Sequence, residues 1–342
     1  MVLKFTIRLL WAAFIIPWCA GTGTARELVL TGATMGTTYH IKVVTEPGKD
    51  GKNLQSRIDQ RLKQLNGSMS TFQTDSEISR FNRLQAVDTE FAVSSDFLAV
   101  MLAADAVYRL TDGAWDGTVK PLVDLWGFGP SGPIQEAPSA QAVAAALKKV
   151  GFEQIEVSAK GFLKKRLAAV TIDLASIAKG YGVDQVSQLI EGMGFRNYLV
   201  EIGGEVYVSG RRPDGKKWRV GINQPLKTAA ANAVYKALEL ENQAMATSGD
   251  YRNFEMIDGR AYSHIIDPRN GYPVNHGVVS TSVVAPNCTL ADGLATAMMV
   301  MGPEKGIALL NRLDSVDGLI IVQKADGSLE NFWSRGLKDT SN

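Results

Sequence analysis

The chain has 342 residues, 45% apolar and 21% charged, which are values of a folded globular protein and exclude a disordered chain, a collagen and a coiled coil. It carries 36 Lys and Arg against 35 Asp and Glu, and this near balance argues against a dedicated nucleic-acid binder. Two cysteines and three histidines are too few for a disulfide framework, a cysteine-rich zinc site or a multi-histidine metal centre.

Residues 1–25 have the features of a secretory signal peptide. Lys4 and Arg8 precede an apolar run, and small residues follow it. The run is shorter than the ~20 apolar residues that span a bilayer. We therefore expect residues 26–342 to form one exported, periplasmic domain. The alternatives are an uncleaved signal anchor and a lipid on Cys19, where a bulky preceding residue disfavours lipid attachment.

Hydrophobic periodicity predicts the elements that follow. In chain order we expect a strand over 37–46, helices over 53–65, 94–110 and 139–150, a buried strand over 169–174 and a helix over 176–193. Strands over 198–209, 218–223, 233–240 and 278–285, helices over 289–301 and 303–313, and a strand over 318–323 complete the chain. There is no clean βαβ alternation, so we predict the α+β class, with mixed β-sheets and packed helices, over a doubly wound parallel sheet.

Residues 127–132 have the G-x-G-x-x-G spacing of a dinucleotide-binding loop. That motif requires a helix to open directly on the glycines. Pro130 lies inside the segment and Pro133 follows it, so we interpret it as a Gly/Pro-rich loop.

Three other segments contain candidate site residues. Lys179 lies near the start of the helix predicted from 176, where a cation is disfavoured and a bound anion such as phosphate would be favoured. The alternative is a solvated surface lysine.

Asp292 and Thr296, four residues apart on a predicted helix, share a face and offer oxygen, which suits Mg²⁺. An acid in a first helical turn and a buried threonine are the structural alternative.

His264 comes just before Asp267-Pro-Arg-Asn-Gly271, which is strong turn chemistry. A histidine at this position acts either as a general base or phosphate partner, or as a structural residue that caps the turn. On the residue alone, the structural role is favoured.

Taken together, these segments resemble the FAD:protein FMN transferase (ApbE) family. The matching pieces span nearly all of the chain after residue 25 and keep the family's order. They are Met35-Gly-Thr-Thr-Tyr39, Met69-Ser-Thr-Phe72, Ser79-Arg-Phe-Asn82, Trp115-Asp-Gly-Thr-Val119, Pro121-Leu122, Trp126-Gly-Phe-Gly129, Asp173-Leu-Ala-Ser-Ile-Ala-Lys-Gly-Tyr181, Glu201-Ile-Gly-Gly-Glu205, Thr247-Ser-Gly-Asp-Tyr251, His264-Ile-Ile-Asp-Pro268 with Gly271, and Ala291-Asp292 with Thr296.

The resemblance implies an ApbE-like fold and an activity. Such an enzyme moves FMN from FAD to a Thr or Ser hydroxyl of an exported or membrane flavoprotein and releases AMP, with Mg²⁺ bridging the FAD pyrophosphate. Membrane association would come through the target or the N-terminus. The alternatives are a Mg²⁺-dependent FAD pyrophosphatase, which uses water as the acceptor, and a non-catalytic FAD-binding protein.

By motif position, the resemblance assigns roles to twelve residues. It places His264 beside the reacting phosphate. The metal is assigned to Ser176, Asp292 and Thr296. FAD is assigned to Met35, Phe72, Ala114, Trp115, Asp116, Asp173, Lys179 and Ile266. Many members have tyrosine where this chain has Phe72, and many have glycine at the position of Ala175 or Ser176.

Overall fold

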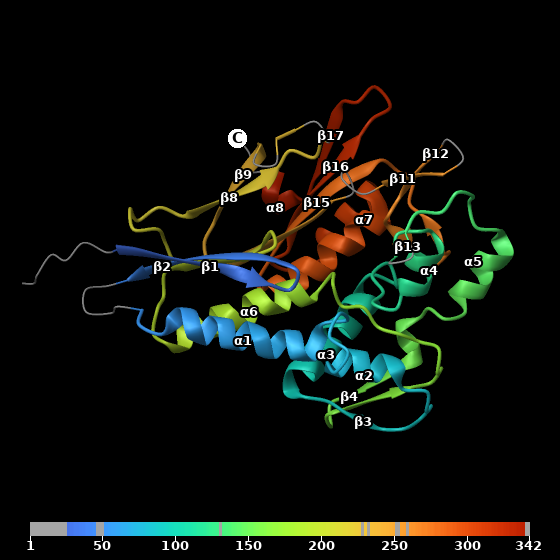
Figure 1. The fold of residues 1–342 in the computed structure, drawn as a ribbon. Coiled ribbons are helices and arrows are strands. Elements are labelled where there is room, and N and C mark those ends of the chain that lie inside the picture. Colours follow the sequence, from blue (N-terminus) through green and yellow to red (C-terminus); the bar gives the residue numbers. More distant parts are fainter. Residues whose placement is uncertain are drawn as a thin grey trace, which may run out of the picture.

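An eight-stranded sheet forms the centre of the molecule (Figure 1). The computed structural model describes residues 26–45, 51–129, 132–226, 229–230, 233–249, 254–257 and 260–338; the predicted signal peptide 1–25, with Cys19, lies outside them. In spatial order, the strands are β1 (Arg26–Thr34), β2 (Thr37–Thr45), β6 (Tyr198–Ile202), β7 (Glu205–Ser209), β10 (Gln243–Gly249), β15 (Val278–Ala285), β16 (Asp317–Gln323) and β17 (Leu329–Trp333).

Every neighbouring pair of strands in this sheet is antiparallel. Tight turns explain two of these pairs, because an antiparallel pair needs a connection of only about two residues. Met35 and Gly36 join β1 to β2, and Gly203 and Gly204 join β6 to β7, all four with positive φ. The strand predicted over 198–209 is therefore two strands of a hairpin. The predicted α+β class is confirmed.

Helices cover one face of the sheet in two layers (Figure 1). In the inner layer, α6 (Ala178–Gly192) packs against β6 and β7, and α7 (Cys288–Leu310) packs against β10, β15 and β16. In the outer layer, α1 (Leu54–Met69) packs against α6, and α3 (Ser95–Leu110) packs against α7. The helix predictions over 53–65, 94–110 and 176–193 are confirmed within a few residues.

The other face of the sheet carries the hairpin of β8 (Trp218–Asn223) and β9 (Val234–Leu240). Its apolar side chains share a second core cluster with Val206, Leu319 and their neighbours on the sheet. The remaining elements are α2 (Glu77–Arg83), α4 (Lys120–Leu125), α5 (Ala140–Leu147), α8 (Arg335–Lys338), β3 (Phe91–Ala92), β4 (Ile155–Ser158), β5 (Phe162–Lys165), β11 (Phe254–Ile257), β12 (Arg260–Ser263), β13 (Ile266–Asp267) and β14 (Tyr272–Pro273), with a 3₁₀ turn over Phe152–Gln154.

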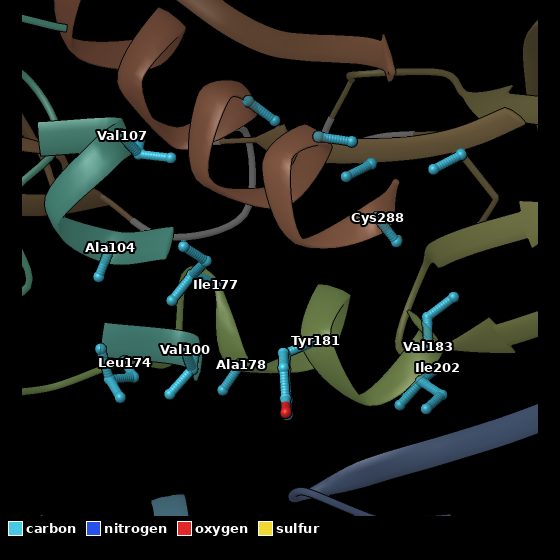
Figure 2. Close-up of a cluster of buried hydrophobic side chains, with 14 of the residues drawn as sticks. Val100, Ala104, Val107, Leu174, Ile177, Ala178, Tyr181, Val183, Ile202 and Cys288 are labelled. Carbon is cyan, nitrogen blue, oxygen red and sulfur yellow. The ribbon is translucent and has the colours of Figure 1, made fainter. Parts of the chain in front are cut away.

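The main core lies where α3, α6 and α7 meet (Figure 2). Val107 of α3, Ile177 before α6 and Gly293 of α7 come together, since a Cβ at Gly293 would lie 3.2 Å from Val107 and 3.4 Å from Ile177. The small Ala and Gly residues on α7 thus allow a close approach of three helices. This packing holds the start of α6 against the first half of α7.

The prediction of a strand over 169–174 is wrong. The apolar side chains Val170, Ile172 and Leu174 are buried as expected, but the segment pairs with no strand in the part of the chain that the structure describes. Instead, the Asn82 side chain accepts a hydrogen bond from Ile172 N (2.7 Å) and donates one to Ile172 O (2.8 Å). A side-chain amide replaces the partner strand, because it satisfies both backbone groups that burial removes from water.

Helix α7 contains the helix predicted over 289–301 and most of the one predicted over 303–313, since it ends at Leu310. Gly302, with φ 76°, interrupts the helical backbone before Pro303, so the two halves are joined at a kink. Within the described residues, no helix combines the length and apolar character of a membrane span.

Candidate active site

A cavity of about 1040 Å³ is lined by the loops before α4 and α6, the start of β7, the end of β10, the segment 264–268 and the first half of α7. Ten of the twelve predicted site residues line it. They are Ala114, Trp115, Asp116, Asp173, Ser176, Lys179, His264, Ile266, Asp292 and Thr296. These residues are separated by up to 182 positions in the chain, so their convergence is a property of the fold.

Met35 and Phe72 are not among the residues that line this cavity. The Phe72 ring is 96% exposed in the loop between α1 and α2. Met35 lies in the β1–β2 turn and packs near α6, where a Cβ at Gly182 would be 3.2 Å from Met35 Cε. The structure therefore does not place these two predicted FAD contacts with the other ten.

The start of α6 is held against α7 through Gly180 and Asp292. Asp292 Oδ2 accepts a hydrogen bond from Gly180 N (2.9 Å), which satisfies one of the free N–H groups of the helix start. A Cβ at Gly180 would lie 2.3 Å from Cys288 O and 2.8 Å from Asp292 Cβ. Only glycine allows this approach. Because α7 begins at Cys288, Asp292 lies one turn inside the helix and not in the first turn.

We expect Gly180→Ala to lower the free energy of unfolding by about 1–3 kcal/mol or more, because the new methyl group meets backbone atoms that cannot move aside. Chemical denaturation measures this value. Gly192→Ala is the matched control on the same helix, where an added Cβ meets nothing within 4 Å. Equal stability of the two variants would contradict the packing argument.

Lys179 lies between two buried carboxylates. Its Nζ is 3.3 Å from Glu205 Oε1 and 4.0 Å from Asp292 Oδ1, and it donates to Ala175 O at 3.2 Å. Burial lowers the pKa of Lys179, but Asp292 and Glu205 outweigh burial and raise it above its ordinary value. The lysine is thus a half-buried cation that lines the cavity and is paired with two buried acids, which disfavours the alternative of a solvated surface lysine.

The two carboxylates also affect each other. Burial first, and then repulsion from Asp292, raise the pKa of Glu205 to about 8. Burial likewise raises the pKa of Asp292, against the opposing effect of Lys179. The raised pKa of both acids shows that Lys179 alone does not compensate their charges, so a bound cation would favour their ionised forms.

Hydroxyl groups flank the acids. Thr296 Oγ1, one helical turn beyond Asp292, lies 3.0 Å from Ser248 Oγ at the end of β10. Ser176 Oγ, in the loop before α6, accepts a hydrogen bond from Trp115 Nε1 (3.0 Å). Trp115 itself is almost fully buried and packs on the Phe152 ring. The indole therefore fixes the position of the Ser176 hydroxyl.

Asp116 and Asp173 organise the loops of the cavity wall. Asp116 accepts hydrogen bonds from Thr118 N, Thr118 Oγ1 and Phe152 N, and burial raises its pKa to about 6. Asp173 Oδ1 accepts from Ala175 N, while Asp173 N donates to Gly117 O. Both residues line the cavity and at the same time join the 114–118 loop to its neighbours.

His264 and Ile266 enter the cavity wall from the segment between β12 and β14. The His264 ring packs edge-on against Phe128, with 6.3 Å between ring centroids. Ile266 is buried beside Leu122 and Trp126. The Asp267–Gly271 turn follows as predicted, with Gly271 N donating to Asp267 O. His264 thus faces the cavity, which supports its candidate role.

The sequence analysis did not include several polar residues of the cavity wall, among them Lys120, Glu205, Thr247 and Ser248. Glu205 and Ser248 line the cavity and contact Lys179 and Thr296, respectively. Both lie in segments that carry the family resemblance, Glu201–Glu205 and Thr247–Tyr251. The signal was therefore present in the motifs, but only the fold reveals which residues these side chains contact.

Comparisons with known proteins agree with this architecture. The model of the ApbE family matches residues 35–320. The FAD:protein FMN transferase of Vibrio cholerae is 43% identical over 307 residues, 90% of each chain, and that of Escherichia coli K12 is 35% identical over 350 residues, 99% of this chain and 98% of the relative. The solved structure of the flavin transferase ApbE from Vibrio cholerae has a TM-score of 0.82 at 42% identity and covers 92% of this chain and 99% of that one. The apo flavinyl transferase ApbE of Pseudomonas stutzeri also scores 0.82, at 36% identity, with 93% and 97% covered. The chain belongs to the ApbE family.

Proposed function

We propose that this chain is a Mg²⁺-dependent FAD:protein FMN transferase, which moves FMN from FAD to a Thr or Ser hydroxyl of a target protein and releases AMP. The FAD:protein FMN transferases it matches over most of its length support the activity. The observation that carries the site assignment is the charged cluster at the cavity, in which Lys179 pairs with the buried acids Asp292 and Glu205. The cavity volume of about 1040 Å³ is just above the ~300–1,000 Å³ that is typical of ligand sites, and it suits a ligand as large as a dinucleotide.

The side chains present fit Mg²⁺. Asp292 supplies a carboxylate, and Thr296 and Ser176 supply hydroxyl oxygens on the same cavity. Glu205 Oε2 is buried without a hydrogen-bond partner among the described residues, which indicates a site short of positive charge. No cluster of three or more His, Cys, Asp or Glu forms within those residues. The oxygen donors of Asp292, Thr296 and Ser176 favour Mg²⁺ over zinc, because Mg²⁺ binds through one or two carboxylates together with substrate phosphates and water.

The transfer forms a P–O bond to the acceptor oxygen and breaks the pyrophosphate bond of FAD, so AMP leaves and the acceptor hydroxyl loses its proton. When bound, Mg²⁺ would neutralise part of the pyrophosphate charge. Lys179 would hold the rest through its ammonium group. His264 either receives the proton of the hydroxyl or donates a hydrogen bond to the phosphate in transfer. Trp115 keeps the Ser176 hydroxyl in place during these steps.

We place the enzyme outside the cytoplasm, as an exported, periplasmic protein. The support is the sequence pattern of residues 1–25. The acceptor would then be an exported or membrane flavoprotein, and any association with the inner membrane would come through that target or through the N-terminus.

Intact mass spectrometry of an acceptor domain tests the activity. The protein is incubated with FAD, Mg²⁺ and the acceptor, and a parallel sample lacks Mg²⁺. An FMN-sized mass increase on a threonine or serine, lost without Mg²⁺, is the expected result. Free FMN and AMP without acceptor labelling would establish a pyrophosphatase instead. Bound FAD that remains intact in the presence of several acceptors would indicate a binding protein.

A further inference from the structure

The Thr296 hydroxyl, one of the proposed metal ligands, has a defined neighbour. Ser248 Oγ lies 3.0 Å away, at the end of β10. Both side chains line the cavity, and they come from different elements, a strand and a helix. None of the roles that the family resemblance assigns includes Ser248.

The sheet holds this pair in a fixed position. Ser248 is the register partner of Thr281 on β15. Thr281 Oγ1 donates a hydrogen bond to Ala295 O at 2.6 Å, and Ala295 directly precedes Thr296 in α7. Two neighbouring hydroxyls of the sheet therefore contact two consecutive residues of the helix. This double contact sets the rotation of α7 at Thr296.

A hydroxyl group has one proton and two lone pairs. A hydroxyl that binds a cation uses a lone pair for the metal, and its O–H becomes a stronger donor. Its proton then needs an acceptor that does not lie in the metal site. Ser248 Oγ is such an acceptor for Thr296, within hydrogen-bond distance.

We propose that Ser248 is a positioning residue for the metal: its Oγ accepts a hydrogen bond from the Thr296 hydroxyl and so turns a Thr296 lone pair toward the cation. This inference rests on the proposed function, because it needs Thr296 to be a metal ligand. Groups that orient metal ligands in this way typically change metal affinity by about 10–100-fold when they are replaced. Ser248 does not itself contact the reacting atoms in this role.

Mn²⁺ binding tests the proposal, since free Mn²⁺ is counted directly by electron paramagnetic resonance and needs no turnover. The full chain and the variants Ser248→Ala, Thr296→Ala and the double variant are titrated. We expect Ser248→Ala to weaken Mn²⁺ binding by about 10-fold or more. We expect the same substitution to add little in the Thr296→Ala background, because its effect passes through Thr296.

Ser282→Ala is the matched control. Ser282 Oγ forms the adjacent hydroxyl pair, 2.8 Å from Thr247 Oγ1, and is buried away from the cavity lining. The Ser282→Ala variant loses a similar hydroxyl–hydroxyl contact that does not involve Thr296. Its Mn²⁺ affinity should therefore equal that of the wild type.

The activity assay supplies a second readout. Ser248→Ala should raise the Mg²⁺ concentration for half-maximal transfer by a similar factor, with little change in the rate at saturating Mg²⁺. Unchanged Mn²⁺ affinity in Ser248→Ala, an equal loss in Ser282→Ala, or an undiminished loss in the Thr296→Ala background would each overturn the proposal. A wild-type protein that neither binds Mn²⁺ nor transfers FMN would instead refute the proposed function.

Discussion

Replacing His264 with alanine is expected to lower the rate of FMN transfer by about 10²–10⁴-fold, the usual contribution of a side chain that moves a proton or stabilises the reacting group. FAD affinity should change little, because His264 is assigned to the reacting phosphate and most of the cavity wall comes from other elements. Transfer is measured by intact mass of the acceptor, and FAD binding by quenching of flavin fluorescence.

Two further variants separate chemistry from packing. His264→Asn keeps an N–H donor but cannot exchange a proton near neutral pH, so high activity in this variant would assign hydrogen bonding to the phosphate. Phe128→Leu removes the aromatic contact to the His264 ring while leaving the imidazole. Wild-type transfer by His264→Ala would exclude a catalytic role for the residue.

Replacing Asp292 with asparagine is expected to abolish the response to Mg²⁺ at concentrations that saturate the wild type. Asparagine is similar in size, and its amide oxygen can still accept the hydrogen bond from Gly180 N. The variant therefore removes the charge while keeping the junction of α6 and α7. Mn²⁺ binding and the Mg²⁺ dependence of transfer both measure the loss.

Thermal unfolding of the same Asp292→Asn variant is an independent test, because the direction of the change in its unfolding temperature can be predicted. Burial raises the pKa of Asp292, so the ionised carboxylate destabilises the metal-free fold relative to a neutral group. Metal-free Asp292→Asn should thus unfold at the same temperature as the wild type or higher, without the stabilisation that Mg²⁺ gives the wild type. A normal Mg²⁺-induced shift in this variant would rule out Asp292 as the main ligand.

Local patterns in the sequence predicted most of the secondary structure. The spacing of Leu54, Ile58, Leu62 and Leu65 predicted α1, whose buried face contains these four residues. Ser94, at the start of the helix predicted over 94–110, caps α3 by accepting a hydrogen bond from Phe97 N. Such signals lie within a few residues of each other, so they need no knowledge of the rest of the chain.

The exceptions depend on distant partners. Burial at Val170, Ile172 and Leu174 was predicted correctly, but the strand was not, because Asn82 takes the place of a paired strand. An apolar run shows that a segment is buried, and does not show what satisfies its backbone.

The site likewise has features that the sequence predicted and features that only the fold revealed. By itself, the sequence determined the α+β class, the family resemblance and ten residues that line one cavity, because each depends on residue types in a fixed order along the chain. Only the tertiary structure decided that Phe72 is exposed away from the cavity lining, that Glu205 pairs with Lys179, and that Ser248 meets Thr296. These are contacts between elements far apart in the chain. Close packing of α6 and α7 on the sheet sets them, and no local pattern records it.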